Sequence, residues 1–181
     1  MVGCIGSAVK GIPFIDFGPY DGPAVCAVGS LNADLVAYES GSWVPGAYNV
    51  GDRFEFNAGG KGLNVAMSVA ATGLPSYLVG RVGNDMFGQF LKRALTLGSV
   101  NQDLVKTDPA GYTGVGHVRV DAHRDYDTCV VPGTNNHVDA GDTTSVLNHA
   151  MAFSHLVMSF EIPSQPWLTR PDASARPDPK W

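Results

Sequence analysis

Basic clusters, cysteine pairs and long apolar runs are all missing from this sequence of 181 residues. Lys plus Arg total 12 against 17 Asp plus Glu, a net charge of -5, so a nucleic-acid partner is not expected. The three cysteines, Cys4, Cys26 and Cys129, are widely spaced and form no C-x-x-C pair, which argues against a disulfide framework or a zinc ribbon and favours a reducing cytosol. No run approaches the roughly 18 apolar residues that a membrane span requires. We therefore expect a cytoplasmic protein with no membrane partner.

The 22 glycines follow no Gly-X-Y period, which excludes collagen. With 44% hydrophobic and 16% charged residues, the chain is too apolar to be disordered throughout and is long enough for one domain. The two ends differ from this pattern. Residues 1–23 carry neither a helical nor a strand period and are predicted to be an irregular leader. Residues 163–181 hold five of the 12 prolines and are predicted to be a disordered tail.

Strands and helices are predicted to alternate between these ends. Short apolar runs predict buried strands over 24–29, 77–82 and 155–160, whereas apolar residues at helical spacing predict helices over 63–72, 86–97 and about 144–152. Residues 30–34 are expected to be a polar turn, residues 36–56 a small β excursion, and residues 116–131 a hairpin. Cys129, in an apolar strand of that hairpin, is expected to be a core residue. The alternation of strands and helices favours a parallel sheet.

A glycine run, Gly59-Gly60-Lys61-Gly62, leads into the first predicted helix and reaches Asn64. Unpaired N–H groups at a helix N-terminus attract anions or polar oxygens, and glycines let a ligand approach the backbone. The run is neither a P-loop, which needs Ser or Thr after Lys61, nor G-x-G-x-x-G. Taken alone, the pattern is equally typical of a tight strand-to-helix turn with a solvated Lys61.

Polar residues also follow two of the predicted buried strands. Asn32 and Asp34 come just after the first strand and Glu161 just after the last, where open α/β sheets place ligand-binding groups. An amide and a carboxylate two residues apart can hold neighbouring hydroxyls. The alternative is that Asn32 and Asp34 form a turn and that Glu161 merely ends its strand. The five histidines show no paired metal-ligand spacing, so no metal site is predicted.

Several short motifs occur in an order that resembles one family, the ribokinase-like carbohydrate kinases of the phosphofructokinase-B type, and comes nearest to its ribokinase members. The resemblance extends from about Ala24 to Pro163. The motifs that carry it are Val28–Asp34, Ala58–Asn64, Gly80–Gly88, Thr113-Gly114, Val131–Asn135 and Ser159–Glu161.

The resemblance implies an α/β fold, with a Rossmann-like parallel sheet flanked by helices and a small β lid, and an activity. That activity is the ATP-dependent, Mg²⁺-assisted transfer of a phosphoryl group to a primary hydroxyl of a sugar, with ribose as first choice. The lid would close over the sugar and supply a homodimer contact. The residues implied to contact the sugar are Asn32, Asp34, Gly59, Gly60, Lys61, Gly62, Asn64 and Glu161.

The sequence departs from the family at the catalytic end. The family's base is the Asp of a Gly-Ala-Gly-Asp motif, which does not occur here, and no glutamate has the Asn three residues before it that the family uses near magnesium. A sequence similar to this motif occurs at Val138–Thr144, but it precedes Glu161, whereas the family's motif would follow it. Asp142 or Thr143 is therefore interpreted as a helix N-cap.

Residues 24–162 are therefore expected to be the N-terminal part of such a kinase domain, incomplete at its C-terminal side. Without the base and the nucleotide site, this chain is expected to be inactive alone and to bind neither ATP nor Mg²⁺. Two alternatives remain: a sugar-binding or dimerising fragment, or the non-functional product of a frameshifted gene.

Overall fold

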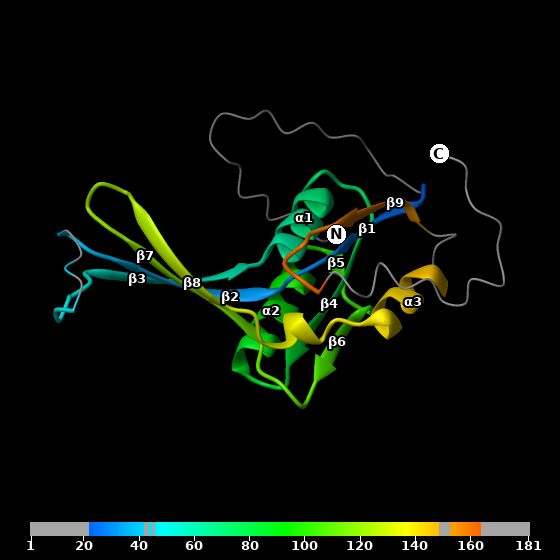
Figure 1. Ribbon diagram of the computed structural model, residues 1–181. Coiled ribbons are helices and arrows are strands. Elements are labelled where there is room, and N and C mark those ends of the chain that lie inside the picture. Colours follow the sequence, from blue (N-terminus) through cyan, green and yellow to red (C-terminus); the bar gives the residue numbers. More distant parts are fainter. Residues whose placement is uncertain (1–21, 42–43, 45, 149–152, 164–181) are drawn as a thin grey trace.

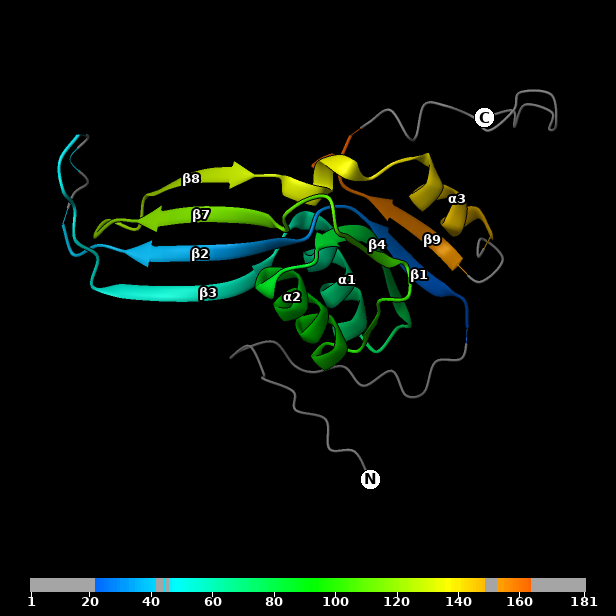
Figure 2. The same ribbon diagram turned by 90° about the horizontal axis from the view of Figure 1, so that it is seen from below.

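A parallel sheet forms the body of the molecule in the computed structural model, which describes residues 22–41, 44, 46–148 and 153–163. Its strands lie in the order β5-β4-β1-β9, and β6 pairs with the end of β4 (Figures 1 and 2). The strand bounds are β1 Ala24–Val28, β4 Ser76–Gly83, β5 Val100–Asn101, β6 Val105–Asp108 and β9 Phe153–Met158. All these pairs are parallel, as the alternation of strands and helices predicted.

Helices cover both faces of this sheet. Strand β1 is therefore buried on both sides, which explains why it is apolar along its whole length. The helices α1 (Lys61–Ala71) and α2 (Met86–Leu97) enclose one core with Ala27 and Leu78. The third helix, α3 (Ala140–Asn148), lies over the opposite face, where Cys26, Val28 and Val79 pack with Val146. The α/β fold with a parallel sheet flanked by helices is confirmed.

A second, four-stranded sheet projects from the body as a long arm (Figures 1 and 2). Its order is β3-β2-β7-β8, with bounds β2 Asn32–Tyr38, β3 Arg53–Gly59, β7 Gly114–Val120 and β8 Tyr126–Val131. The predicted hairpin is β7 and β8, and it joins the β excursion in one sheet, so this lid sheet is larger than expected. The short 3₁₀ helix η1 (Gly133–His137) then leads the chain from β8 back to the body.

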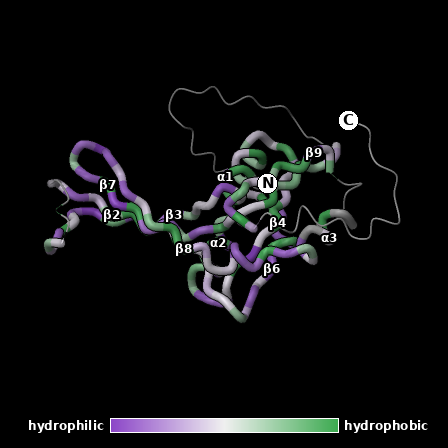
Figure 3. Tube along the Cα trace, in the orientation of Figure 1, coloured by the Kyte–Doolittle hydropathy of each residue, from purple (hydrophilic) through white to green (hydrophobic). Residues whose placement is uncertain are grey.

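The lid sheet and the body differ in polarity. Apolar residues gather in the strands of the body, whereas the outer turn of β7 and β8 is hydrophilic (Figure 3). Cys129 is exposed on β8, so its prediction as a core residue was wrong. The reason is that β8 is the edge strand of the lid sheet and all its residues are exposed.

Two local predictions are also corrected. Residues 30–34 are not a turn, because strand β2 already begins at Asn32 and Asp34 lies within it. Helix α3 begins at Ala140, and its N-terminus is capped by Asp139, whose Oδ1 accepts from the N–H groups of Gly141 at 2.7 Å and Asp142 at 3.3 Å. Asp142 returns a bond from the first turn, since its Oδ2 accepts from the Asp139 N–H at 2.9 Å. Asp142 is therefore the second half of a capping box and not the N-cap.

The predicted leader and tail lie outside the described residues, except for residues 22, 23 and 163 at their inner ends. Over the ranges that are described, no helix is long and apolar enough to cross a membrane.

Candidate functional site

The candidate site lies where the lid sheet leaves the body, at the carboxyl ends of β1 and β9. Alternation along β2 places Asn32 and Asp34 on one face of the lid sheet. In register, Asn32 lies opposite Gly59 of β3 and Gly114 of β7, and Asp34 lies opposite Gly116. Three of the neighbours of these two side chains are therefore glycines.

The glycines on both flanking strands make room for the Asp34 carboxylate. A Cβ built on Gly59 would overlap Asp34 Oδ2, and a Cβ built on Gly116 would overlap Asp34 Oδ1. The carboxylate thus lies against bare backbone on both sides. Burial raises the pKa of Asp34 above its ordinary value, and the negative charge of nearby Glu161 raises it further.

Gly60 and Gly62 fit the start of α1 closely against the body. Gly60 has a φ of 93°, and a Cβ there would come within 2.6 Å of the Ser30 carbonyl oxygen. Such a backbone conformation favours glycine. A Cβ on Gly62 would lie 2.5 Å from the Gly29 carbonyl carbon, so Gly62 sits at the contact between helix and strand.

Lys61 and Glu161 join the helix start to the end of β9. Lys61 Nζ lies 2.7 Å from Glu161 Oε1, and the Ser30 hydroxyl donates to Glu161 Oε2 at 2.7 Å. Burial works to raise the pKa of Glu161, but the hydrogen bonds from Lys61 and Ser30 outweigh it and hold that pKa below its ordinary value. Glu161 is therefore an anion at neutral pH, and its negative charge acts on the neighbouring Asp34.

An open hollow of about 550 Å³ borders this ion pair, within the size range of small-molecule sites. Its walls come from the first turns of α1, from the last residue of β9 and from the segment after it. The lining residues are Lys61, Asn64, Val65, Met158, Ser159, Phe160 and Glu161. Asn64, predicted from the glycine run, is exposed here one turn after Lys61.

The structure thus gathers every predicted site residue around one junction, although Gly62 faces the body. Two polar residues of the junction were not predicted. Ser30, 1% exposed, accepts from the Lys61 N–H at 3.0 Å while it donates to Glu161. Asn135, in η1 and also 1% exposed, binds the backbone of Leu31 and the side chain of Asn32. Ser30 lies two residues after the end of β1, so the rule that selected Asn32 could have found it. Asn135 belongs to one of the motifs of the family resemblance.

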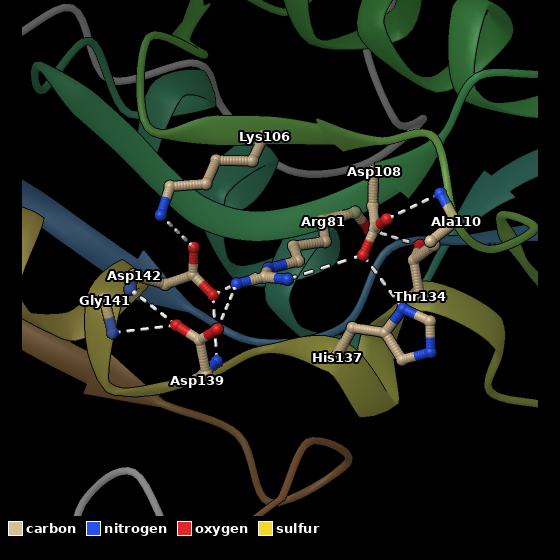
Figure 4. Close-up of polar contacts among 9 residues, drawn as sticks. All are labelled: Arg81, Lys106, Asp108, Ala110, Thr134, His137, Asp139, Gly141 and Asp142. Atoms are coloured by element: carbon tan, nitrogen blue, oxygen red, sulfur yellow. Dashed lines mark hydrogen bonds and ion pairs between the residues drawn. The ribbon is translucent and has the colours of Figure 1, made fainter.

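A separate cluster of charged residues fastens α3 to β4 and β6 (Figure 4). The Arg81 guanidinium contacts Asp139 at 2.6 Å, Asp142 at 2.8 Å and Asp108 at 3.4 Å. Lys106 pairs with the other oxygen of Asp142 at 2.7 Å, and the Asp142 side chain is fully buried. Because its oxygens are bound by cations, Asp142 is not available as a catalytic base.

The described residues fit a neutral polyhydroxyl ligand better than a triphosphate. The carboxylates of Asp34 and Glu161 accept hydrogen bonds from hydroxyls, but they repel phosphate oxygens. The charge of Glu161 is already paired with Lys61 at 2.7 Å, which weakens its attraction for Mg²⁺ but leaves its oxygens able to accept a further hydrogen bond. Among the described residues, no three His, Cys, Asp or Glu side chains are grouped to hold a metal ion.

Residues 23–160 match the model of the pfkB family of carbohydrate kinases. The ribokinase of Bacillus subtilis is 28% identical over 141 residues, 78% of this chain and 48% of that protein. The ribokinase of Schizosaccharomyces pombe is 30% identical over 148 residues, 77% of this chain and 46% of that protein. The chain thus spans about half the length of the curated relatives it matches.

Solved structures show the same likeness. The ribokinase of Arabidopsis thaliana complexed with ribose and ATP superposes with a TM-score of 0.70 at 27% identity, over 78% of this chain and 47% of that one. The ribokinase of Cryptococcus neoformans in complex with ADP gives a TM-score of 0.69 at 27% identity, over 81% of this chain and 45% of that one.

Proposed function

Because this chain belongs to the pfkB family of carbohydrate kinases, we propose that it holds the sugar acceptor of an ATP-dependent phosphoryl transfer, with ribose as the first candidate. The observation that carries this proposal is the Asp34 carboxylate, set between Gly59 and Gly116 and beside Glu161. A carboxylate that is open to a ligand but flanked by bare backbone suits hydroxyl groups brought close to the sheet.

The polar side chains of the junction are proposed to bind the sugar from two sides. Asn32 and Asp34 bind sugar hydroxyls from the lid sheet, with Asp34 as acceptor. Lys61 and Glu161 meet the sugar from the body, one as donor and the other as acceptor. Gly59 leaves room for the Asp34 carboxylate, Gly60 and Gly62 let the start of α1 lie close to the body, and Asn64 closes the hollow from α1. Closure of the lid sheet would exclude water from the reacting hydroxyl.

Ribose is favoured by the relatives. Three of the curated relatives are ribokinases. The Arabidopsis thaliana ribokinase, part of whose fold this chain shares, was solved with ribose and ATP. Bound ATP would supply the phosphoryl group, with Mg²⁺ neutralising its charge. The residues of the junction fit the sugar and not the triphosphate, so we assign them no contact with ATP or Mg²⁺.

The 181 residues contain no Gly-Ala-Gly-Asp and no Asn-x-x-Glu sequence. We therefore propose that this polypeptide by itself binds a sugar but transfers no phosphoryl group. A cytoplasmic location, expected from the cysteine pattern, stays part of the proposal.

The lid sheet is proposed as a homodimer contact. It carries exposed apolar side chains on its strands, among them Phe54, Tyr126, Val130 and Val131, each between 49% and 71% exposed. Sedimentation analysis of the purified chain tests this: a dimer that persists at micromolar concentration supports the proposal, and a monomer at all concentrations contradicts it.

Isothermal titration calorimetry with ribose tests sugar binding. The wild-type chain should bind ribose, and Asp34→Ala should abolish the heat. Asp52→Ala is the matched control, because Asp52 is exposed before β3 and away from the junction. Absence of binding by the wild type, or equal binding by Asp34→Ala, would overturn the proposal. A parallel assay with ATP, Mg²⁺ and ribose should give no ribose phosphate from this chain alone.

A further inference from the structure

The orientation of one buried amide is fixed by the polypeptide backbone. The Asn135 side chain meets both polar groups of Leu31: its Oδ1 accepts from the Leu31 N–H at 2.9 Å, and its Nδ2 donates to the Leu31 carbonyl at 3.1 Å. A backbone N–H can only donate and a carbonyl can only accept. The Asn135 amide therefore has one allowed orientation, which its hydrogen-bond network assigns.

The fixed orientation of the Asn135 amide also fixes the orientation of the Asn32 amide. The second hydrogen of Asn135 Nδ2 is donated to Asn32 Oδ1 at 2.7 Å, with Asn32 only 5% exposed. The Asn32 oxygen is thus turned toward Asn135. Its Nδ2 is turned the other way and has no hydrogen-bond partner in the described part of the chain.

We propose that Asn135 is a positioning residue that orients the Asn32 amide, so that position 32 offers a hydrogen-bond donor to the acceptor sugar while Asp34 offers an acceptor. The inference rests on the proposed function, because it needs the sugar to lie against these two residues. One hydroxyl can accept from Asn32 and donate to Asp34 at the same time. The pair therefore selects for a hydroxyl and against a deoxy carbon, which leaves both groups unpaired.

The segment that carries Asn135 is held firmly enough for this role. The neighbouring Thr134 donates its N–H to the Tyr112 carbonyl at 2.8 Å and its hydroxyl to the Arg81 carbonyl at 3.2 Å. Five residues after Asn135, the start of α3 is fastened by the ion pairs of Arg81 (Figure 4). Gly114 closes the space around the two amides, since a Cβ there would overlap both Asn32 Oδ1 and Asn135 Nδ2.

The donor direction can be measured in the sugar-free wild-type protein by NMR, without any variant. Scalar coupling across the hydrogen bond should connect the Asn135 side-chain nitrogen with the Asn32 side-chain carbonyl carbon. Coupling in the opposite direction, from the Asn32 nitrogen to the Asn135 carbonyl carbon, would overturn the inference. This measurement stands whether or not the chain binds ribose.

The effect on binding is measured by calorimetry with ribose. Asn135→Asp replaces the donor nitrogen by an oxygen, so Asn32 must turn over, and binding should weaken about tenfold, the loss expected for one hydrogen bond. Asn136→Asp is the matched control: it makes the same chemical change at an exposed neighbour and should leave affinity within about twofold, since a surface change of this kind is nearly neutral.

A double-mutant cycle separates positioning from a general structural effect. In an Asn32→Ala background, Asn135→Asp should weaken ribose binding no further. A further loss of about tenfold in that background would overturn the positioning role. If the wild-type chain binds no ribose at all, the proposed function fails, and the coupling experiment alone decides the orientation of Asn32.

Discussion

Gly114→Ala should damage the junction between β2, β7 and η1 more than its small size suggests. The new methyl group would overlap Asn32 Oδ1 and Asn135 Nδ2 and would lie 2.9 Å from the Leu31 carbonyl oxygen. Asn135 is 1% exposed, so its amide cannot escape into solvent. Overpacking costs about 1–3 kcal/mol, and a buried polar group left unpaired costs about 1–3 kcal/mol. The free energy of unfolding should therefore fall by roughly 2–6 kcal/mol, the sum of the two ranges.

Thermal unfolding followed by circular dichroism measures this loss. A protein of this size loses about 2–4 °C of Tm per kcal/mol, so Gly114→Ala should melt at least about 4 °C below the wild type. Gly41→Ala is the control, because a Cβ there meets nothing within 4 Å. A Tm for Gly114→Ala equal to that of Gly41→Ala would refute the packing described for the two amides.

Three further predictions concern charge and burial. Glu161→Gln should lower the pKa of Asp34, measured by NMR titration, because the Glu161 charge helps to raise it; the folded state then loses less stability as the pH rises and Asp34 ionises. An unchanged or higher pKa would contradict the proximity of the two carboxylates. Arg81→Ala should lower the free energy of unfolding in urea by about 1.5–3 kcal/mol, because it removes one of the two cations that bind the fully buried Asp142 and leaves Lys106 as the other; a loss below about 1 kcal/mol, the value of a surface pair, would contradict it. Burial raises the pKa of the Cys26 thiol to about 12, so native protein at pH 8 should be alkylated at the exposed cysteine of β8 and not at Cys26, as mapped by mass spectrometry; rapid labelling of Cys26 would show that β1 is accessible.

Local signals predicted the body of the fold well. Helix α2 has the bounds expected, Met86–Leu97, because its amphipathic period is framed by two strong terminal signals. At its start, Asp85 accepts from the Gly88 N–H at 2.8 Å, and Gly98 ends it. The buried strands β1 and β4 were equally clear, since their apolar runs lie between turn residues.

Contacts between distant segments explain what local signals missed. Asn and Asp are poor strand formers, so Asn32 and Asp34 looked like a turn. Their place in β2 depends on Gly59 and on the glycines of β7, whose pairing with β2 a local pattern does not reveal. Asn135 likewise stands 103 residues from Asn32 in the sequence, and only the fold brings their amides together.

The sugar site proposed at the junction of the lid sheet and the body can be tested directly. Titration of the ¹⁵N-labelled chain with ribose, followed by NMR chemical shifts, tests both binding and location. We predict saturable shifts at Asn32, Asp34, Gly60, Lys61 and Glu161, with none at the outer turn of β7 and β8. Shifts confined to other surfaces, or no shifts at millimolar ribose, would contradict the account.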